Sequence, residues 1–344
     1  MFDDDNEPKF FSERPEWEDV VPLEQYENMA PLAPIMYTPE YKDATNYFRA
    51  IAKSGEKSAR VLELTEAVIR MNPGHYSAWQ YRYETLLATS SSLTTELALM
   101  DELAVKYLKS YQVWHHRRLL QTLIRKPVPE LAFITRSLAE DSKNYHTWSY
   151  RQWLLGYFND ENELWTGELD FVDEILAKDV RNNSAWHHRY FVVWASGVRD
   201  GDQDRERVLR RELTFVKQSI SLAPNNASAW NYLRGVLQSQ KIPFETLAAF
   251  VKPYSELFDP SVTDIIDVDN PRPSSTAQLP CAAAIEFLAD VYEEQSKEEG
   301  ERGAEGRLKA IELWKSLANE HDTIRKNYWE YRIREILAAN KPKA

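Results

Sequence analysis

Apolar residues recur through the central part of the chain at spacings of three and four, which is the period of a helix with one buried face. Two segments show this most clearly, one with Leu131, Ile134 and Leu138 and one with Leu209, Leu213, Val216 and Ile220. The helix that follows such a segment opens on a polar stretch, such as Asn182-Asn183-Ser184 or Pro224-Asn225-Asn226, whose side chains can cap free backbone N–H groups. The pattern therefore predicts pairs of helices joined by short turns.

A tryptophan and an arginine one helical turn apart return at a nearly fixed interval. The pairs are Trp79 and Arg82, Trp114 and Arg117, Trp148 and Arg151, Trp186 and Arg189, then Trp230 with Arg234, at steps of 35, 34, 38 and 44 residues between tryptophans. Repeats of this length are typical of stacked helical hairpins, because no single hairpin can bury its apolar face alone. We expect an all-α fold, a right-handed superhelix of repeated hairpins that forms a crescent-shaped solenoid. In it, Trp fills the space between helices and Arg reaches a carboxylate or a carbonyl.

Prolines interrupt the pattern at two places. Residues 1–38 are acidic and contain five prolines, which predicts an extended or disordered arm, and Thr38-Pro39-Glu40 reads as the start of the first helix. Residues 253–280 hold another five of the 17 prolines, which predicts a loop insertion. We therefore expect a single helical-repeat domain over residues 39–344, with a turn at Gly300 to Gly306.

Composition narrows the setting. The chain has 344 residues, one cysteine, 10 glycines and a net charge of −12, and it contains no long apolar run. A single cysteine excludes an internal disulfide and a cysteine-rich zinc site, and the negative charge argues against a surface that follows nucleic acid. We expect a soluble, cytoplasmic protein. The charge is uneven, however, because residues 105–155 carry nine Lys and Arg against three Asp and Glu. This basic segment would attract an anionic ligand, unless its side chains only face solvent or pair with neighbouring carboxylates.

No Walker loop, dinucleotide fingerprint or hydrolase motif is present. The pairs His115-His116 and His187-His188 are better explained by packing than by metal binding, because adjacent helical positions point about 100° apart. Polar residues ahead of two successive tryptophans would lie side by side if the repeats stack in parallel, and would offer donors to phosphate or carboxylate oxygens. They are Lys109, Tyr111, Gln112, Asn144, Tyr145 and His146. The alternative is that each is a solvated or locally packed residue.

Four runs of the sequence resemble the alpha-subunit repeats of protein prenyltransferases of the farnesyl and type I geranylgeranyl classes. They are KSYQVWHHRR from Lys109, KNYHTWSYRQW from Lys143, DVRNNSAWHHRYFV from Asp179 and PNNASAWNYLRG from Pro224. The run YTPEYKDATNYFRA from Tyr37 is similar to that family's first helix. The resemblance implies a chain wrapped around a separate beta subunit. The pair would transfer a farnesyl or geranylgeranyl group from its diphosphate to the cysteine of C-terminal CaaX sequences. It also implies two cofactors, magnesium and a zinc ion that the beta subunit binds.

The same resemblance implies roles for the six polar residues. Lys109 would be catalytic and would reach the isoprenoid diphosphate, with Asn144, Tyr145 and His146 at the same diphosphate. Gln112 would bind the C-terminal carboxylate of the protein substrate, and Tyr111 would line the same cleft. Ser110 departs from the commoner asparagine, so the local helix cap is expected to differ.

Three other interpretations remain. A non-catalytic adaptor of the tetratricopeptide kind shares the 34-residue period and would bind peptide tails, although its W-x-x-L-G start is missing here. The alpha subunit of the Rab-directed prenyltransferase usually carries extra domains, for which 344 residues leave no space. Binding of single-stranded nucleic acid through stacked aromatics is disfavoured by the acidic charge and by the core periodicity of those aromatics.

Overall fold

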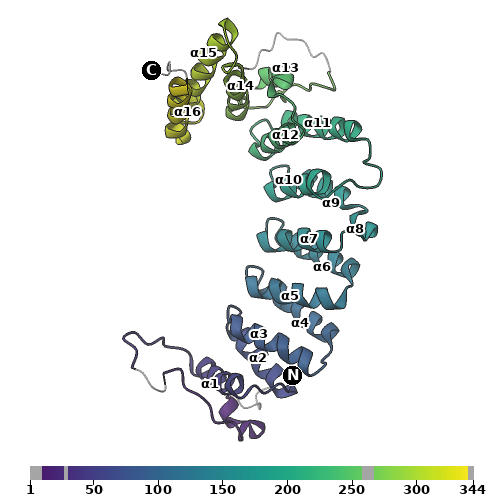
Figure 1. Ribbon diagram of the computed structural model, residues 1–344, viewed down its shortest axis with the longest axis vertical. Coiled ribbons are helices and arrows are strands. Elements are labelled where there is room, and N and C mark those ends of the chain that lie inside the picture. The colour runs from purple at the N-terminus through teal and green to yellow at the C-terminus, as the bar shows by residue number, and fades with distance from the viewer. Residues whose placement is uncertain (1–9, 27–29, 258–266, 340–344) are drawn as a thin grey trace. The chain divides into compact units, whose positions relative to one another are not determined.

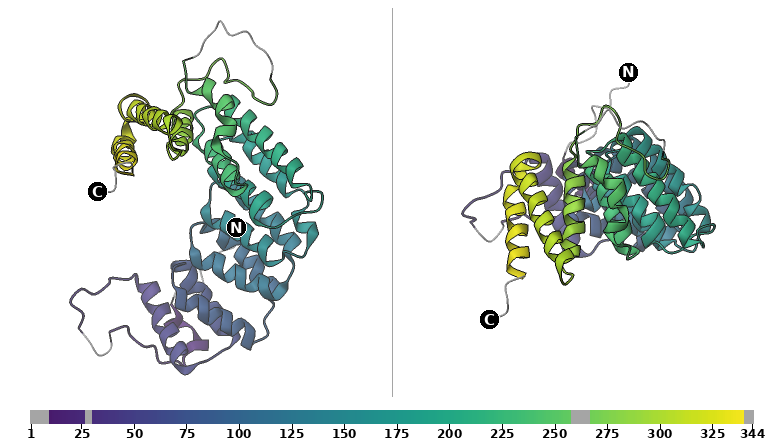
Figure 2. Two further views of the ribbon diagram at one scale, coloured as in Figure 1. Left: turned by 45° about the horizontal axis from the view of Figure 1, so that its top comes forward. Right: turned by 90° about the horizontal axis from the view of Figure 1, so that it is seen from above.

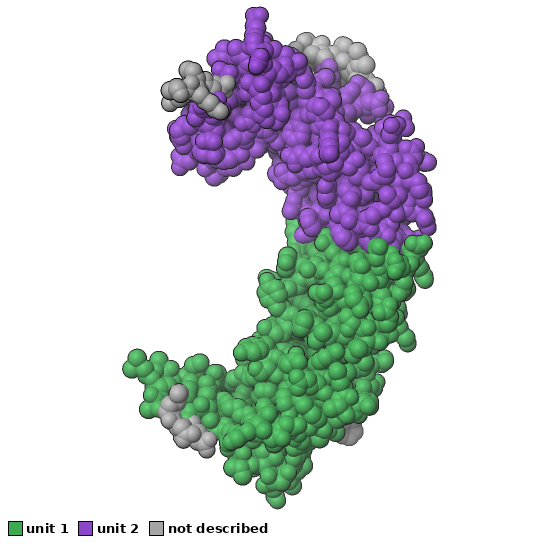
Figure 3. Space-filling view, in the orientation of Figure 1, with its two compact units in different colours: residues 1–164 green, residues 165–344 purple. Residues whose placement is uncertain are grey.

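The computed structural model describes residues 10–26, 30–257 and 267–339, and over these residues it contains helices and no β-strand (Figure 1). The chain divides into two compact units, residues 1–164 and residues 165–344, which Figure 3 shows in separate colours. The expectation of an all-α fold built from repeated helical hairpins is confirmed.

The first unit holds one leading helix and three hairpins. Its helices are α1 (Pro39–Ser54), α2 (Ala59–Met71), α3 (Tyr76–Ala88), α4 (Leu93–Lys106), α5 (Tyr111–Ile124), α6 (Pro127–Glu140) and α7 (Tyr145–Tyr157), followed by the short α8 (Asn162–Trp165) at the junction of the two units. Helices α2 and α3, α4 and α5, and α6 and α7 pair within hairpins, while α3, α5 and α7 contact one another in succession (Figure 2). The second helices of the hairpins therefore form one continuous row.

The second unit continues the same plan. Its helices are α9 (Glu168–Lys178), α10 (Asn183–Tyr190, extended by a π-helical turn over Phe191–Ala195), α11 (Arg205–Leu222), α12 (Ala227–Ser239), the short α13 (Ala248–Val251), α14 (Ala282–Gln295), α15 (Glu301–Ser316) and α16 (Lys326–Ala339). The predicted loop at 253–280 lies partly outside the described residues. Its described end runs along α11, where Lys217 Nζ donates to the Asp269 carbonyl at 2.9 Å and Ser274 N donates to the Ser221 carbonyl at 3.1 Å.

The first helix begins where the sequence predicts. Thr38 caps α1 by accepting a hydrogen bond from Tyr41 N at 3.3 Å, and Pro39 is the first helical residue. The residues before it were predicted to be extended or disordered. The described ones include two 3-10 turns with buried Phe11 and Trp17, whose rings meet edge to face at 5.4 Å. The sequence analysis missed this anchor, because two aromatics isolated among prolines and acids show no periodicity.

The predicted turn at Gly300 to Gly306 is wrong for most of its length, because α15 begins at Glu301 and contains two of these glycines. A Cβ added at Gly303 would lie 1.9 Å from the Glu298 carbonyl oxygen, and one at Gly306 would lie 2.9 Å from the Tyr292 carbonyl oxygen. Because these two residues have no side chain, α15 can pack closely on α14 and on the turn that precedes α15. Only Gly300, with φ of 86°, uses the left-handed conformation that favours glycine in a turn.

Every tryptophan of the five repeats makes the same hydrogen bond. The indole N–H donates to the backbone carbonyl six residues earlier, in the turn that precedes its helix. The pairs are Trp79 with Pro73 (2.9 Å), Trp114 with Leu108 (3.0 Å), Trp148 with Ser142 (2.9 Å), Trp186 with Val180 (2.8 Å) and Trp230 with Pro224 (2.8 Å). The predicted core position of these rings is confirmed, since all five are 5% exposed or less. The hydrogen bond gives each tryptophan a second role, because it ties the turn between the two helices of a hairpin to the second of these helices.

Asparagine caps connect successive repeats through some of the same carbonyls. Asn144 Oδ1 accepts from Thr147 N at 3.0 Å and caps α7, while its Nδ2 donates to the Leu108 carbonyl at 3.3 Å. Asn226 caps α12 and donates to the Val180 carbonyl at 2.6 Å in the same way. At α5 the residue is Ser110, whose hydroxyl donates to the Pro73 carbonyl at 3.3 Å but caps nothing. The predicted change of local cap at Ser110 is confirmed.

A buried glutamate in the first helix of a hairpin binds residues from two repeats. Glu96 accepts from Arg82 of the preceding repeat at 2.7 and 2.8 Å and from His116 of its own repeat at 2.8 Å. Burial by itself would raise the pKa of Glu96, but the hydrogen bonds from His116 and Arg82 lower this pKa to about 2. The carboxylate is therefore ionised at neutral pH and holds two helices together.

The same arrangement recurs with tyrosine in place of histidine. Glu130 accepts from the buried Arg117 at 2.9 Å and from the Tyr150 hydroxyl at 2.7 Å, and Glu212 is bound by Arg189 and Tyr232 at 2.7 Å each. A further pair, His188 with Glu168, stands 2.7 Å apart. The His or Tyr always lies 20 residues after its glutamate. The predicted packing of these histidines is confirmed for His116 and His188, which are 1% exposed or less, but is wrong for His115 and His187, which are exposed.

Replacing Glu130 by Gln is expected to lower the free energy of unfolding by about 3 kcal/mol, because the buried Arg117 then loses its buried carboxylate and keeps only the half-exposed Asp101, at 2.7 Å, as an ionised partner. Chemical denaturation measures this change. The matched control is Glu140→Gln at the exposed end of the same helix, which should change stability by less than about 0.5 kcal/mol. Equal effects of the two substitutions would contradict a structural role for the buried carboxylate.

His75 makes stability depend on pH. Its Nδ1 accepts a hydrogen bond from Ala78 N at 3.1 Å and so caps α3, which requires a neutral ring, and burial lowers the pKa of this imidazole. A lowered folded pKa gives stability that is present above the unfolded pKa, near 6.5, and is lost as the pH falls through the folded value. We expect the unfolding free energy to fall less between about pH 7.5 and 5 in His75→Asn than in the unmodified chain. Asn is the cap that α7, α10 and α12 already use. Identical pH profiles would show that the cap does not titrate.

Candidate functional site

The six polar residues singled out from the sequence come from corresponding places in two successive hairpins of the first unit. Lys109 stands two residues before α5, and Tyr111 and Gln112 open that helix. Asn144 is the cap of α7, and Tyr145 and His146 open it. We refer to Lys109, Tyr111, Gln112, Asn144, Tyr145 and His146 as the α5–α7 cluster.

Three rings join the two halves of this cluster. The rings of Tyr111 and His146 meet edge to face with centroids 4.3 Å apart, and Tyr145 contacts the same imidazole at 5.5 Å. Tyr111 and Tyr145 are each 68% exposed, so their hydroxyls face solvent rather than the core. Parallel stacking of α5 and α7 thus brings together residues 35 positions apart, as the repeat predicts.

The charge and donors of the cluster suit an anion. Lys109 is exposed, and its ammonium makes no ion pair with any described residue. Burial lowers the pKa of His146, so the ring is neutral near pH 7 and presents one N–H donor. Ser110 makes no capping bond at α5, which leaves the first N–H groups of that helix without a side-chain partner.

Asn144 differs from the other five residues. It is 4% exposed, its Oδ1 accepts from Thr147 N, and its Nδ2 donates to the Leu108 and Asp141 oxygens. Both ends of the amide are therefore occupied inside the protein. Asn144 therefore fixes the start of α7, the helix that the exposed Tyr145 and the half-buried His146 open.

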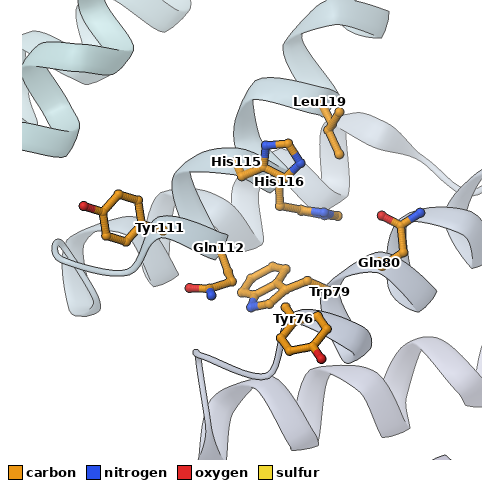
Figure 4. Close-up of a pocket in the computed structure, with 8 residues that line it drawn as sticks. All are labelled: Tyr76, Trp79, Gln80, Tyr111, Gln112, His115, His116 and Leu119. Atoms are coloured by element: carbon orange, nitrogen blue, oxygen red, sulfur yellow. The ribbon is translucent and has the colours of Figure 1, made fainter.

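A pocket of about 460 Å³ lies between α3 and α5 (Figure 4). It is lined by Tyr76, Trp79, Gln80, Tyr111, Gln112, His115, His116 and Leu119. Gln112 lies beside the Trp79 indole and Tyr76, while Gln80 stands at the opposite side. The Ser110 hydroxyl, whose single proton is shared with the Pro73 carbonyl, lies 3.4 Å from Gln112 Oε1, so the amide nitrogen of Gln112 is left to donate toward a ligand.

Tyr76 is a lining residue that the sequence reasoning missed. It is the first residue of α3 and 74% exposed, as Tyr111 and Tyr145 are first and exposed in α5 and α7. The available signal was its position, because each of these tyrosines stands three residues before the repeat's tryptophan. The repeats with Trp186 and Trp230 have Asn183 and Ala227 there instead.

The described residues contain neither a cluster of metal ligands nor a membrane-crossing helix. No group of three or more His, Cys, Asp and Glu side chains among them could hold a metal ion. Within the same residues, none of the helices combines the length and the apolar character needed to cross a bilayer.

Comparisons with known proteins agree with the geometry. The family described as "Protein prenyltransferase alpha subunit repeat" matches residues 58–89, 93–123, 129–158, 165–196 and 209–240, which are the hairpins from α2 to α12. The chain is 37% identical to the protein farnesyltransferase/geranylgeranyltransferase type-1 subunit alpha of Dictyostelium discoideum, over 95% of this chain and 94% of that protein. It is 36% identical to the subunit of the same name from Schizosaccharomyces pombe, over 92% of each chain.

A solved structure shows the same fold. The chain superposes with a TM-score of 0.75 and 29% identity on Candida albicans protein geranylgeranyltransferase-I complexed with GGPP, covering 92% of this chain and 97% of that one. This chain agrees with these relatives in length, in its repeats and in much of its sequence. The chain therefore belongs to the family of protein farnesyltransferase/geranylgeranyltransferase type-1 alpha subunits.

Proposed function

We propose that this chain is the alpha subunit of a heterodimer that transfers a farnesyl or geranylgeranyl group from its diphosphate to the cysteine of C-terminal CaaX sequences. The family and the names of the relatives support the activity. The observation that carries the assignment to particular residues is the α5–α7 cluster, in which an unpaired lysine and exposed ring donors from two repeats adjoin a pocket. A non-catalytic adaptor of the tetratricopeptide kind is disfavoured, because the repeats match those of the prenyltransferase family.

Lys109 acts on the leaving group. In the transfer, the bond between the first isoprenoid carbon and the diphosphate oxygen breaks, its electron pair leaves with the diphosphate, and the substrate sulfur bonds to that carbon. Negative charge therefore grows on the diphosphate. The Lys109 ammonium, which has no carboxylate partner among the described residues, stabilises this charge, and the Tyr145 hydroxyl and the His146 N–H donate to the same oxygens. Asn144 contributes by holding the start of α7.

Gln112 binds the protein substrate. Because Ser110 occupies its amide oxygen, the amide nitrogen faces the pocket as a donor for the C-terminal carboxylate. Tyr111 lines the same cleft and its ring contacts His146. The protein substrate and the isoprenoid diphosphate would therefore lie on opposite sides of the Tyr111 and His146 rings. Tyr76 completes the wall on α3.

Metal ions are expected in the active enzyme. We propose that zinc is bound by the beta subunit and that magnesium takes part, with both ions outside this chain's described residues, which offer no suitable group of ligands. Zinc, when bound, would supply an ionised substrate thiol. We also propose a cytoplasmic location, in keeping with a single cysteine that is buried and reduced.

The overall assignment is tested by prenyl transfer from farnesyl diphosphate to a CaaX peptide. The assay compares this chain alone, a candidate beta subunit alone, and both together with zinc. Activity is expected only in the mixture. A stable heterodimer without activity, with either isoprenoid diphosphate, would overturn the proposal.

Lys109→Ala is expected to lower kcat by about 100-fold in the heterodimer, because one preorganised cation at the leaving group is lost. The control is Lys106→Ala in the last turn of α4, an exposed lysine three residues away, which should leave kcat unchanged. Assembly is measured in parallel by gel filtration. Loss of assembly in step with loss of turnover would make Lys109 a structural residue.

Gln112→Glu is expected to raise KM for the CaaX peptide by roughly tenfold, because a donor to the substrate carboxylate becomes a like charge. KM for the isoprenoid diphosphate should stay the same. Gln80→Glu, at the opposite side of the same pocket, is the matched control. If both substitutions raise the peptide KM equally, the effect is a general one of charge, and Gln112 has no special contact.

A further inference from the structure

A second pocket of the first unit, of about 380 Å³, shares Tyr76 with the pocket described above. Its walls come from three segments that are separate in sequence. Gln25 and Tyr37 belong to the N-terminal arm, Arg49 to α1, and His75 and Tyr76 to the start of α3. Among the described residues that line it there is no Asp or Glu.

Arg49 brings a positive charge without a matching carboxylate. Its guanidinium donates to the Leu23 carbonyl at 3.1 Å, to Asn46 Oδ1 at 2.6 Å and to Gln25 Oε1 at 3.3 Å, all of which are neutral acceptors. The negative charge of Glu24 tends to raise the pKa of Arg49, but the Glu24 carboxylate is paired with Lys42 at 3.3 Å. Burial lowers the pKa of Arg49, which is the direction expected for a cation whose charge is poorly compensated.

His75 and Tyr37 add donors. Because Nδ1 of His75 accepts from Ala78 N, the proton of the neutral ring is on Nε2, and this N–H has no hydrogen-bond partner among the described residues. The Tyr37 hydroxyl likewise has no partner in the described part of the chain. A half-buried cation and two free donors thus line one cavity that contains no acid.

We propose that this pocket, lined by Arg49, His75 and Tyr37, is a binding site for an anionic group, a phosphate or a carboxylate. Its volume exceeds that of either group, so the anion would be carried by a larger molecule or accompanied by water. The charge-assisted bonds from Arg49 and the N–H of His75 select the anion. The inference does not depend on the proposed transferase activity, because it rests on the lining of this pocket alone. A free phosphate and the acidic side chain of a bound protein share the required chemistry.

Thermal unfolding of the full chain tests the proposal. Sodium phosphate and sodium glutarate, the second a mimic of an acidic side chain, are titrated at constant ionic strength, with sodium chloride as the reference salt. We expect a saturable rise in Tm above the chloride reference with at least one of the two anions. A larger rise with phosphate assigns the site to phosphate, and a larger rise with glutarate assigns it to a protein carboxylate. No rise with either anion overturns the proposal.

Variants connect the rise to this pocket. Arg49→Gln is expected to abolish the anion-dependent rise in Tm. Arg118→Gln removes an exposed arginine of α5 outside this pocket and should leave the rise unchanged. Because Arg49 also holds the arm, its variant can fail to fold. The double variant His75→Ser with Tyr37→Phe keeps a capping residue on α3 and removes the imidazole N–H and the phenol O–H, and it is expected to weaken the anion's apparent affinity several-fold. An unchanged affinity in this double variant overturns the proposal.

Discussion

The hydrogen-bonded pairing of a buried glutamate with residues of two repeats is the interaction on which the packing of the hairpins depends. Glu96, Glu130 and Glu212 each lie in the first helix of a hairpin and accept from an arginine of the preceding repeat. Each also accepts from a His or Tyr of its own second helix. A carboxylate in a low-dielectric interior is costly unless it is fully paired. The helices are therefore held in the register in which each of these buried glutamates is paired.

That register places the functional residues. Indole N–H groups hold each turn, and Ser110 before α5 and Asn144 before α7 reach back to the preceding turn. The first residues of α3, α5 and α7 therefore follow one another along the row of second helices. These are the positions of Tyr76, Tyr111 and Tyr145, whose rings stand out from the surface because the residues beneath them are engaged in the core. The α5–α7 cluster and the two pockets that contain Tyr76 lie along this row and its edge with α1.

Ser110 shows how one substitution separates two functions of a cap. Asn144 and Asn226 both cap a helix and reach back to the preceding repeat. Ser110 keeps only the second bond, and its hydroxyl also reaches Gln112. The shorter side chain thus leaves the helix N-terminus of α5 less satisfied and orients the Gln112 amide. Both changes favour a negatively charged group at the start of α5.

Periodicity and capping act over a few residues, so the helices, the repeat, the buried tryptophans and the start of α1 could all be predicted from the sequence. The approach of Tyr111 to Tyr145 and His146 could be predicted as well, since corresponding positions in stacked repeats are neighbours. The glutamate that each arginine binds could not be predicted, because such pairs join helices whose sequences carry no mark of the partner. Only the tertiary structure showed that Asn144 is occupied internally, that Gly303 and Gly306 lie within a closely packed helix, and that Phe11 and Trp17 hold the arm on α1. Most of these contacts join segments distant in sequence, and burial and hydrogen-bond geometry exist only once the chain has folded.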